Sequence, residues 1–217
     1  ENIFELEAHL NRLQHSARLI PFQLPASLKQ IRLWTQEVLK IYSKKFPVRI
    51  KIAATKKDIF IKINSLTFDS AIYQGVSATC VDVERHQPQA KAYPYTISYF
   101  AHEKAEKAGF YEALLVDSKG YVREGAYSNL FWIKNGQIFT EKEGALLGIT
   151  QAAVCSWEKV KKGHVTPKEL IEMDEVFLTK TTTGAVPIIK IDKKIIGNGK
   201  PGLITQQILN RFKALGR

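Results

Sequence analysis

The chain has 217 residues, a formal net charge of +11 and 45% hydrophobic residues. This composition is typical of a folded protein with a sizeable core, and it excludes an intrinsically disordered chain. The apolar runs are too short to span a bilayer. The two cysteines, Cys80 and Cys155, lack the spacing of a zinc site or a disulfide framework. We therefore expect a cytoplasmic protein with no membrane segment and no bound metal.

The first part of the chain is predicted to form two helices followed by a strand hairpin. Apolar residues recur at helical spacing over residues 5–20 and again over residues 27–42. In VRIKIAA, residues 48–54, apolar side chains alternate with basic ones, which is typical of a half-buried strand. KKDIFIKI, residues 56–63, provides the hairpin partner.

A polar, proline-containing segment, ERHQPQA, follows at residues 84–90 and indicates a linker. We therefore expect a smaller α+β domain over residues 1–85, a linker at 86–90 and a larger domain over residues 91–217.

The second part alternates helices with short strands. A helix is predicted over residues 96–108, with Gly109 as its C-terminal cap. In YVREGAYSNLFWIKNGQIFTE the pair Asn135-Gly136 indicates a hairpin turn, because both residues tolerate positive φ. The remaining predicted elements are the strand EALLVD, a helix over 149–160, the strand DEVFLTKT, the hairpin VPIIKIDKKIIG and a helix after Pro201.

Basic residues cluster between Lys29 and Lys62. Such a stretch is able to bind nucleic acid, but no aromatic or glycine-rich RNA-binding motif accompanies it. We favour a solvated lysine face on a small α+β unit, and a basic binding protein stays open as an alternative.

Four features carry residue types suited to chemistry. Lys91 lies in QAKAYPY directly after the linker, and Glu124 precedes a glycine at the start of an apolar run. GIT, residues 148–150, opens a helix whose free N–H groups would suit a phosphate. The strand DEVFLTKTTT ends in Thr181–Thr183. Each feature alone has an ordinary structural explanation, so it is their order along the chain that indicates a function.

This order resembles the class IV aminotransferases, the fold-type IV enzymes that use pyridoxal 5′-phosphate. The resemblance covers nearly the whole chain. It is carried by FELEAHLNRLQHSARL, AKAYPY, EALLVDSKGYVREGAYSNLFWIKNGQIFTE, LLGIT, DEVFLTKTTTGAVPI and GNGKPGLIT. It implies an α+β fold with a small α/β sandwich domain and a larger domain that contains a pseudo-barrel of strands. It also implies a homodimer that acts on small molecules, with no nucleic-acid or membrane partner.

The resemblance also implies roles for individual residues. Lys91 would hold pyridoxal 5′-phosphate as a Schiff base and, once released, would shuttle the α-proton. Glu124 would face the pyridine nitrogen and keep it protonated, so that a buried carboxylate is paired with a buried cation. The other implied cofactor-binding residues are Arg12, Ile149, Thr150, Thr181 and Thr182 at the phosphate and Tyr95 near the phenolic oxygen. For Tyr95, packing in the core is an equally open explanation.

The chain departs from the family pattern at several positions. Pro94, Gln151 and Lys180 stand where asparagine, arginine and glycine are common. Family members usually carry a further N-terminal segment, so either this protein is a short variant or the sequence lacks its beginning. Substrate identity and the preference for L- or D-amino acids stay open.

Three functions remain. We expect an aminotransferase that moves an amino group from an amino acid to a 2-oxo acid. An aminodeoxychorismate lyase of the folate pathway, which releases pyruvate and 4-aminobenzoate, would use Lys91 and Glu124 in the same way. A catalytically inactive basic binding protein is the third alternative.

Overall fold

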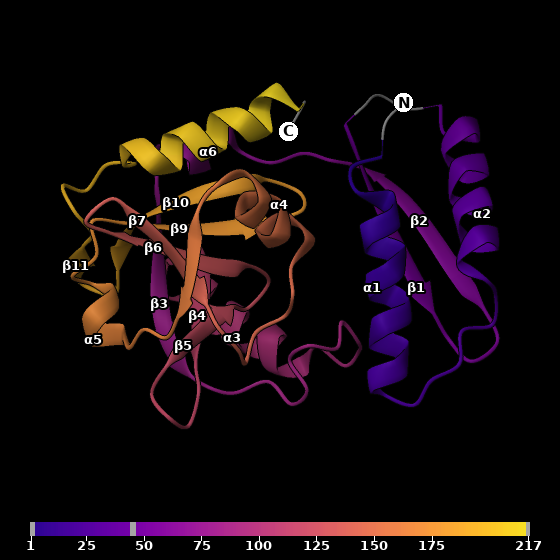
Figure 1. The fold of residues 1–217 in the computed structure, drawn as a ribbon, viewed down its shortest axis with the longest axis horizontal. Coiled ribbons are helices and arrows are strands. Elements are labelled where there is room, and N and C mark those ends of the chain that lie inside the picture. The colour runs from indigo at the N-terminus through magenta and orange to yellow at the C-terminus, as the bar shows by residue number, and fades with distance from the viewer. Residues whose placement is uncertain (1–2, 44–46, 216–217) are drawn as a thin grey trace. The chain divides into compact units, whose positions relative to one another are not determined.

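The computed structural model describes residues 3–43 and 47–215. It divides into two compact units (Figure 1). The smaller unit comprises Glu1–Phe68 with Ala90–Ala92, and the larger unit comprises Asp69–Gln89 with Tyr93–Arg217. This division differs from the predicted boundary at residue 85, because the segment after Phe68 contributes a central strand to the sheet of the larger unit.

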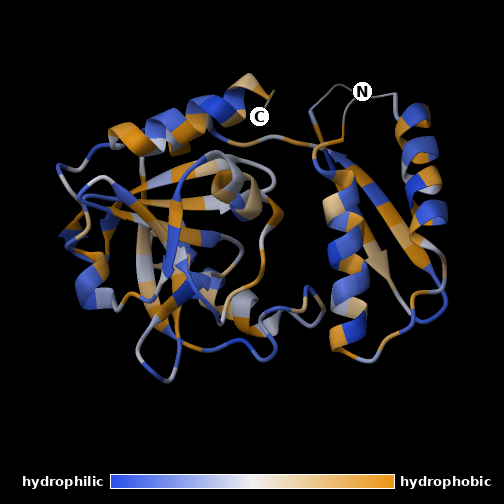
Figure 2. Ribbon diagram, viewed as in Figure 1, coloured by the Kyte–Doolittle hydropathy of each residue, from blue (hydrophilic) through white to orange (hydrophobic). Residues whose placement is uncertain are grey.

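The smaller unit consists of two helices and a strand hairpin. Its elements are α1 (Leu6–Leu19), α2 (Leu28–Ile41), β1 (Val48–Ala54) and β2 (Ile59–Ser65). The Ser27 hydroxyl caps α2 by accepting a hydrogen bond from the Gln30 N–H at 3.2 Å. β1 pairs antiparallel with β2, and half-buried and exposed residues alternate over the first five residues of each strand. Figure 2 shows hydrophobic and hydrophilic residues along this hairpin. The predicted helices and hairpin are confirmed.

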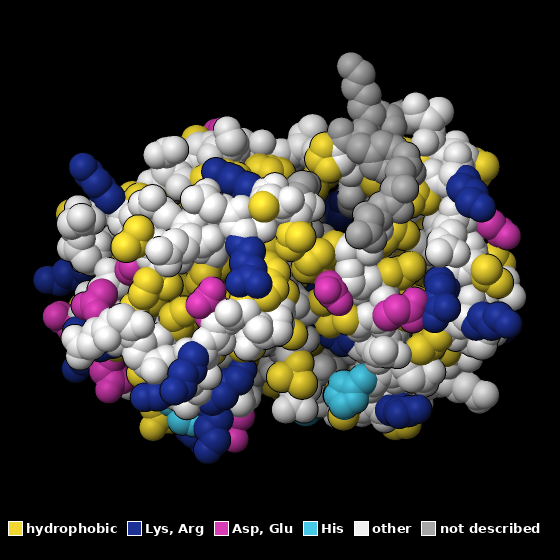
Figure 3. All heavy atoms as spheres, turned by 45° about the horizontal axis from the view of Figure 1, so that its top comes forward, with side chains coloured by type: hydrophobic (Ala, Val, Ile, Leu, Met, Phe, Trp, Pro, Cys, Tyr) yellow, Lys and Arg dark blue, Asp and Glu magenta, His cyan; other side chains and the backbone are white. Residues whose placement is uncertain are grey.

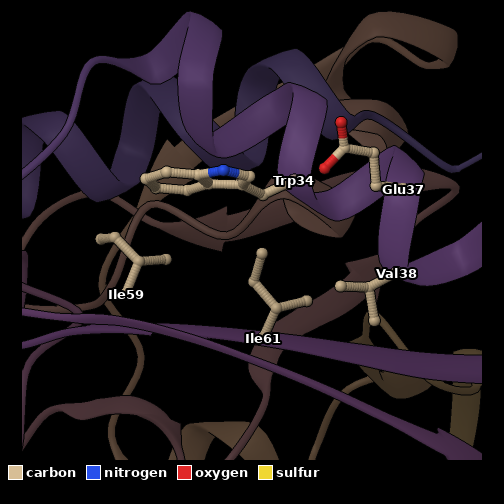
Figure 4. Close-up of a pocket in the computed structure, with 5 residues that line it drawn as sticks. All are labelled: Trp34, Glu37, Val38, Ile59 and Ile61. Atoms are coloured by element: carbon tan, nitrogen blue, oxygen red, sulfur yellow. The ribbon is translucent and has the colours of Figure 1, made fainter.

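A hollow opens between α2 and β2 of the smaller unit. Figure 4 shows that α2 and β2 line it together, with the ring of Trp34 above the side chains of Ile59 and Ile61. Glu37 and Val38 complete the lining. None of these five residues is among those expected to bind a cofactor, so this hollow is not the predicted site.

The larger unit is built on one curled sheet. Its strands are β3 (Val76–Asp82), β4 (Glu112–Val116), β5 (Val122–Gly125), β6 (Asn129–Lys134), β7 (Gln137–Glu141), β8 (Val160–Gly163), β9 (Glu175–Lys180), β10 (Gly184–Ile191) and β11 (Lys194–Ile195). Within the described residues the strand order is β5-β4-β3-β10-β9-β6-β7-β8, and β11 pairs with β10. The helical segments are η1 (Ser70–Gln74), α3 (Thr96–Lys107), α4 (Ile149–Trp157), α5 (Pro167–Leu170) and α6 (Leu203–Ala214).

The sheet is curled, so that its edge strand β5 lies close to β6. There Gly125, the last residue of β5, forms an antiparallel bridge with Ser128, the residue before β6. α6 packs on β9 and β10 (Figure 1). The core is formed by apolar side chains such as Val76, Leu114, Leu178 and Ile188. The predicted α+β fold with a pseudo-barrel of strands is confirmed.

Two strands of the larger unit were not predicted. β3 lies in the middle of the sheet, parallel to both β10 and β4. Val76, Ala78 and Cys80 alternate with Ser77 and Thr79, but these small residues make only a weak strand signal. The helix predicted over residues 149–160 ends at Trp157, and Val160–Gly163 forms β8 alongside β7. The hairpin turn at Asn135 and Gly136 is confirmed, with φ values of 50° and 72°.

Charge on the surface is mixed in sign. On the face drawn in Figure 3, Lys and Arg side chains are interspersed with Asp and Glu. Lys44 and Lys45, which belong to the basic stretch between Lys29 and Lys62, lie outside the described residues. No helix among the described residues is both long enough and apolar enough to cross a bilayer.

Candidate active site

Two predicted site residues, Arg12 and Lys91, belong to the smaller unit. Arg12 lies on α1, with its Nη2 3.4 Å from His9 Nδ1. The backbone N–H of Lys91 donates to Ser16 Oγ at 3.0 Å. Ser16 follows Arg12 by one helical turn, so both residues lie on the same face of α1. The backbone of Lys91 is therefore held on the helix face that carries Arg12.

Glu124 is a buried carboxylate at the end of β5, only 3% exposed. Its Oε1 accepts a hydrogen bond from Arg85 Nη1 at 2.6 Å, which is also an ion pair. Its Oε2 accepts from the backbone N–H of Leu146 at 3.0 Å. A buried charge is costly unless it is paired and hydrogen-bonded, and here both carboxylate oxygens are engaged. The orientation of Glu124 is therefore fixed from two sides.

Arg85 is a site residue that the sequence did not reveal. Besides its ion pair with Glu124, its guanidinium lies 5.7 Å from the ring centroid of Tyr95. Tyr95 is the N-cap residue of α3. Arg85 therefore links the two predicted residues Glu124 and Tyr95. In the sequence it stands in a polar segment that indicates only a linker, and no local pattern points to a partner 39 positions away.

The predicted threonines meet at the start of α4. Thr150 Oγ1 lies 3.4 Å from Thr181 Oγ1, which follows the last residue of β9. Ile149 and Thr150 are the first two residues of α4. The first N–H groups of a helix have no partner within the helix, and the helix dipole favours an anion there. Thr182 is half-buried in the next position, and no hydrogen bond joins it to these groups in the described part of the chain.

One short segment connects Glu124 to the start of α4. The N–H of Leu146 bonds Glu124, and the carbonyl of Leu146 accepts from Asn129 Nδ2 at 2.7 Å. Two residues on, Gly148 lies against Asn129, and a Cβ at this position would overlap Asn129 Oδ1. Only glycine permits the backbone to lie this close to Asn129. Gly148 therefore allows the segment to contact Glu124 and to lead directly into α4.

We expect Gly148→Ala to lower the free energy of unfolding by about 1–3 kcal/mol, because the added methyl group must displace Asn129. Gly163→Ala is a matched control, since its methyl group would meet the nearest atoms of Trp132 and Phe139 at 3.8 Å and 3.9 Å, an ordinary contact distance. Urea unfolding of the two variants checks this. Equal stability of Gly148→Ala and the wild type would contradict it.

A second buried network supports β5 from the residue before Glu124. Arg123 Nε donates to Asp117 Oδ2 at 2.7 Å, and Arg123 Nη1 donates to Glu141 Oε1 at 2.6 Å. Burial alone would raise the pKa of Asp117, but hydrogen bonds from the Tyr121 N–H and from Arg123 hold this pKa below its usual value. The network joins the turn before β5 to the end of β7, and so supports the backbone that carries Glu124.

Comparison with known proteins identifies relatives over nearly the whole chain. The amino-transferase class IV family model matches residues 1–191. A probable branched-chain-amino-acid aminotransferase of Aquifex aeolicus is 33% identical, over 92% of this chain and 73% of that protein. The D-alanine aminotransferase of Bacillus licheniformis is 28% identical, over 95% of this chain and 80% of its own length.

Solved structures agree with these relatives. The structure of the T.th. branched-chain amino acid aminotransferase with pyridoxamine 5′-phosphate has a TM-score of 0.88 and 25% identity, and the match covers 97% of this chain and 78% of that one. The structure of the branched-chain aminotransferase of Thermoproteus uzoniensis with norvaline has a TM-score of 0.89 and 26% identity, over 98% of this chain and 79% of that one.

These relatives are aminotransferases, so the comparisons favour an aminotransferase over the aminodeoxychorismate lyase. They equally favour an enzyme over a basic binding protein. The extent of the family match and the identity to the Aquifex aeolicus protein show that this chain belongs to the class IV aminotransferase family and is an aminotransferase that uses pyridoxal 5′-phosphate.

Proposed function

We propose that this aminotransferase transfers an amino group from a branched-chain amino acid to a 2-oxo acid, and that Glu124 and the threonines at α4 hold the two ends of its cofactor. The observation that carries the proposal is the buried Glu124 carboxylate, held by Arg85 and the Leu146 N–H. A carboxylate suits the protonated ring nitrogen of pyridoxal 5′-phosphate. The hydroxyl pair of Thr150 and Thr181 at a helix N-terminus suits its phosphate. The larger unit thus has groups that match both ends of the cofactor.

The chain's residues then have distinct tasks. Pyridoxal 5′-phosphate, when bound, supplies an electron sink that makes the α-proton of the amino acid removable. Lys91 holds the cofactor, and its Nζ, when free, accepts the α-proton and donates it back during amino transfer. Glu124 would keep a proton on the ring nitrogen, and the Tyr95 hydroxyl would donate to the phenolic oxygen. As the family resemblance implies, Arg12, Ile149, Thr150, Thr181 and Thr182 would hold the phosphate.

The branched-chain substrate rests on similarity. The Aquifex aeolicus and T.th. relatives are named for branched-chain amino acids, whereas the Bacillus licheniformis relative is named for D-alanine. The proposal also includes a homodimer, as the family resemblance implies, and a cytoplasmic location, as the cysteine pattern indicates. Cys80 is a free thiol, and its pKa is raised to about 12. Burial is the largest cause, and the negative charges of Asp192 and Asp82 add to it. Such a thiol is inert and agrees with a reducing compartment.

Two measurements on the wild-type protein test this proposal. Borohydride reduction after incubation with pyridoxal 5′-phosphate is expected to leave a phosphopyridoxyl group on Lys91, located by peptide mass spectrometry. Amino transfer to 2-oxoglutarate is then measured for the L- and D-enantiomers of valine, leucine and isoleucine and for D-alanine, and a branched-chain donor is expected to be fastest.

Each part of the proposal has an outcome that contradicts it. Labels scattered over surface lysines would remove Lys91 from its role. A fastest rate with D-alanine would overturn the branched-chain substrate. Release of pyruvate from aminodeoxychorismate without an amino acceptor would restore the lyase alternative.

A further inference from the structure

A buried ion pair lies directly before the threonine turn, which we define as Thr181–Thr183. Lys180 is the last residue of β9, and its Nζ lies 3.0 Å from Glu112 Oε2 at the start of β4. In the sheet, β10 and β3 separate β9 from β4. The ion pair is therefore formed across the curl of the sheet, beside the bridge between Gly125 and Ser128.

The Glu112 carboxylate is completely buried and surrounded by polar partners. Ser128 Oγ donates to its Oε2 at 3.0 Å, and His102 Nδ1 lies 3.2 Å from its Oε1. Burial would raise the pKa of Glu112, but the His102 hydrogen bond and the charge of Lys180 hold it below its usual value. Burial would lower the pKa of Lys180, and the charge of Glu112 outweighs this and raises it. Both groups therefore stay charged at neutral pH.

The ammonium group of Lys180 is directed into the protein. Besides its contact with Glu112, it lies 4.6 Å from the ring centroid of Tyr111. Its side chain is only 15% exposed. Lys180 is thus engaged by Glu112 and Tyr111, and its effect on a ligand must be exerted through the backbone that it holds.

We propose that the Lys180–Glu112 ion pair positions Thr181 to bind the cofactor phosphate. This inference rests on the proposed function. The Lys180 carbonyl accepts a hydrogen bond from the Thr183 N–H at 3.4 Å. Lys180 therefore precedes the threonine turn and is also bonded to its last residue, while its own side chain is held by Glu112. Thr181 Oγ1 then stays 3.4 Å from Thr150 Oγ1 at the start of α4. A glycine, common at this position in the family, has no side chain with which to form this ion pair.

The test compares two ligands that differ only in the phosphate, pyridoxal 5′-phosphate and pyridoxal, titrated into the cofactor-free full chain. Lys180→Met is expected to raise the Kd for pyridoxal 5′-phosphate about tenfold and the Kd for pyridoxal less than about twofold. The Lys180–Glu112 ion pair positions only the group that binds the phosphate, and pyridoxal has no phosphate. Glu112→Gln keeps the size of the side chain but removes the charge that faces Lys180, and it is expected to give a selective loss in the same direction. Lys190→Met, at an exposed position of the neighbouring strand β10, is the matched control.

The outcomes separate this inference from the proposed function. If the wild type binds neither ligand, the proposed function fails. If the wild type binds both and Lys180→Met keeps the wild-type ratio of the two Kd values, the inference is overturned. This includes an equal weakening of both ligands, which would show a purely structural role. If Lys180→Met does not fold, as judged by circular dichroism, the ratio measured for Glu112→Gln decides.

Discussion

Lys91→Ala is expected to lower the rate of amino transfer by at least about a thousandfold, because one side chain both holds the cofactor and moves the α-proton. Proton transfer by a positioned side chain alone contributes about a hundred- to ten-thousandfold. The measurement is the single-turnover reaction of a branched-chain amino acid with the cofactor-loaded variant, followed by the absorbance of the cofactor. Lys107→Ala, which removes an exposed lysine from α3, is the control and should react like the wild type.

Two further readouts separate a chemical defect from a folding defect in Lys91→Ala. The first is the unfolding midpoint, and alanine retains the backbone N–H of Lys91 that donates to Ser16 Oγ on α1. A small primary amine added to the solution should restore part of the rate, since it can replace the missing amino group. A variant that keeps more than about a tenth of the wild-type rate would show that Lys91 is not the base.

Local patterns predicted the elements that follow a simple period. The helices α1 and α2, the β1–β2 hairpin and the turn at Asn135-Gly136 each depend on residues close in sequence. β3 was missed because its alternating residues are small and only weakly apolar, and β8 because four residues are too few to show a period. Missing β3 also accounts for the difference in the domain boundary. Without this strand, the sequence gives no sign that the segment after Phe68 belongs to the larger unit.

The family motifs indicate individual candidate residues, but they do not indicate the groups that contact those residues. Glu124, Thr150 and Thr181 were identified from family motifs, whereas their contacts depend on how the sheet curls. Arg85 reaches Glu124 from a segment that looks like a linker, and Lys180 reaches Glu112 across two strands. Long polar side chains give no periodic signal, so the partner of a buried charge becomes evident only in the fold.

Glu124→Gln is expected to lower the amino-transfer rate by about a hundred- to thousandfold, because it removes the charge proposed to keep the ring nitrogen protonated. Glutamine has the size of glutamate, and its amide oxygen can still accept from the Leu146 N–H, but its NH2 group then faces Arg85. The variant also removes the negative charge of Glu124, which pairs with Arg85 at a position where Arg85 is only 12% exposed. This should reduce the free energy of unfolding by about 3 kcal/mol.

Arg85→Met separates these two effects of Glu124. It breaks the same buried ion pair and should destabilise the protein by a similar amount, about 3 kcal/mol. It leaves the carboxylate in place, hydrogen-bonded to Leu146, so the rate should fall far less than in Glu124→Gln. The rates are compared with saturating pyridoxal 5′-phosphate, and stabilities by urea unfolding. If both variants lose stability and rate in parallel, the carboxylate has only a structural role, since a charge that acts on the cofactor must affect the rate beyond its effect on folding.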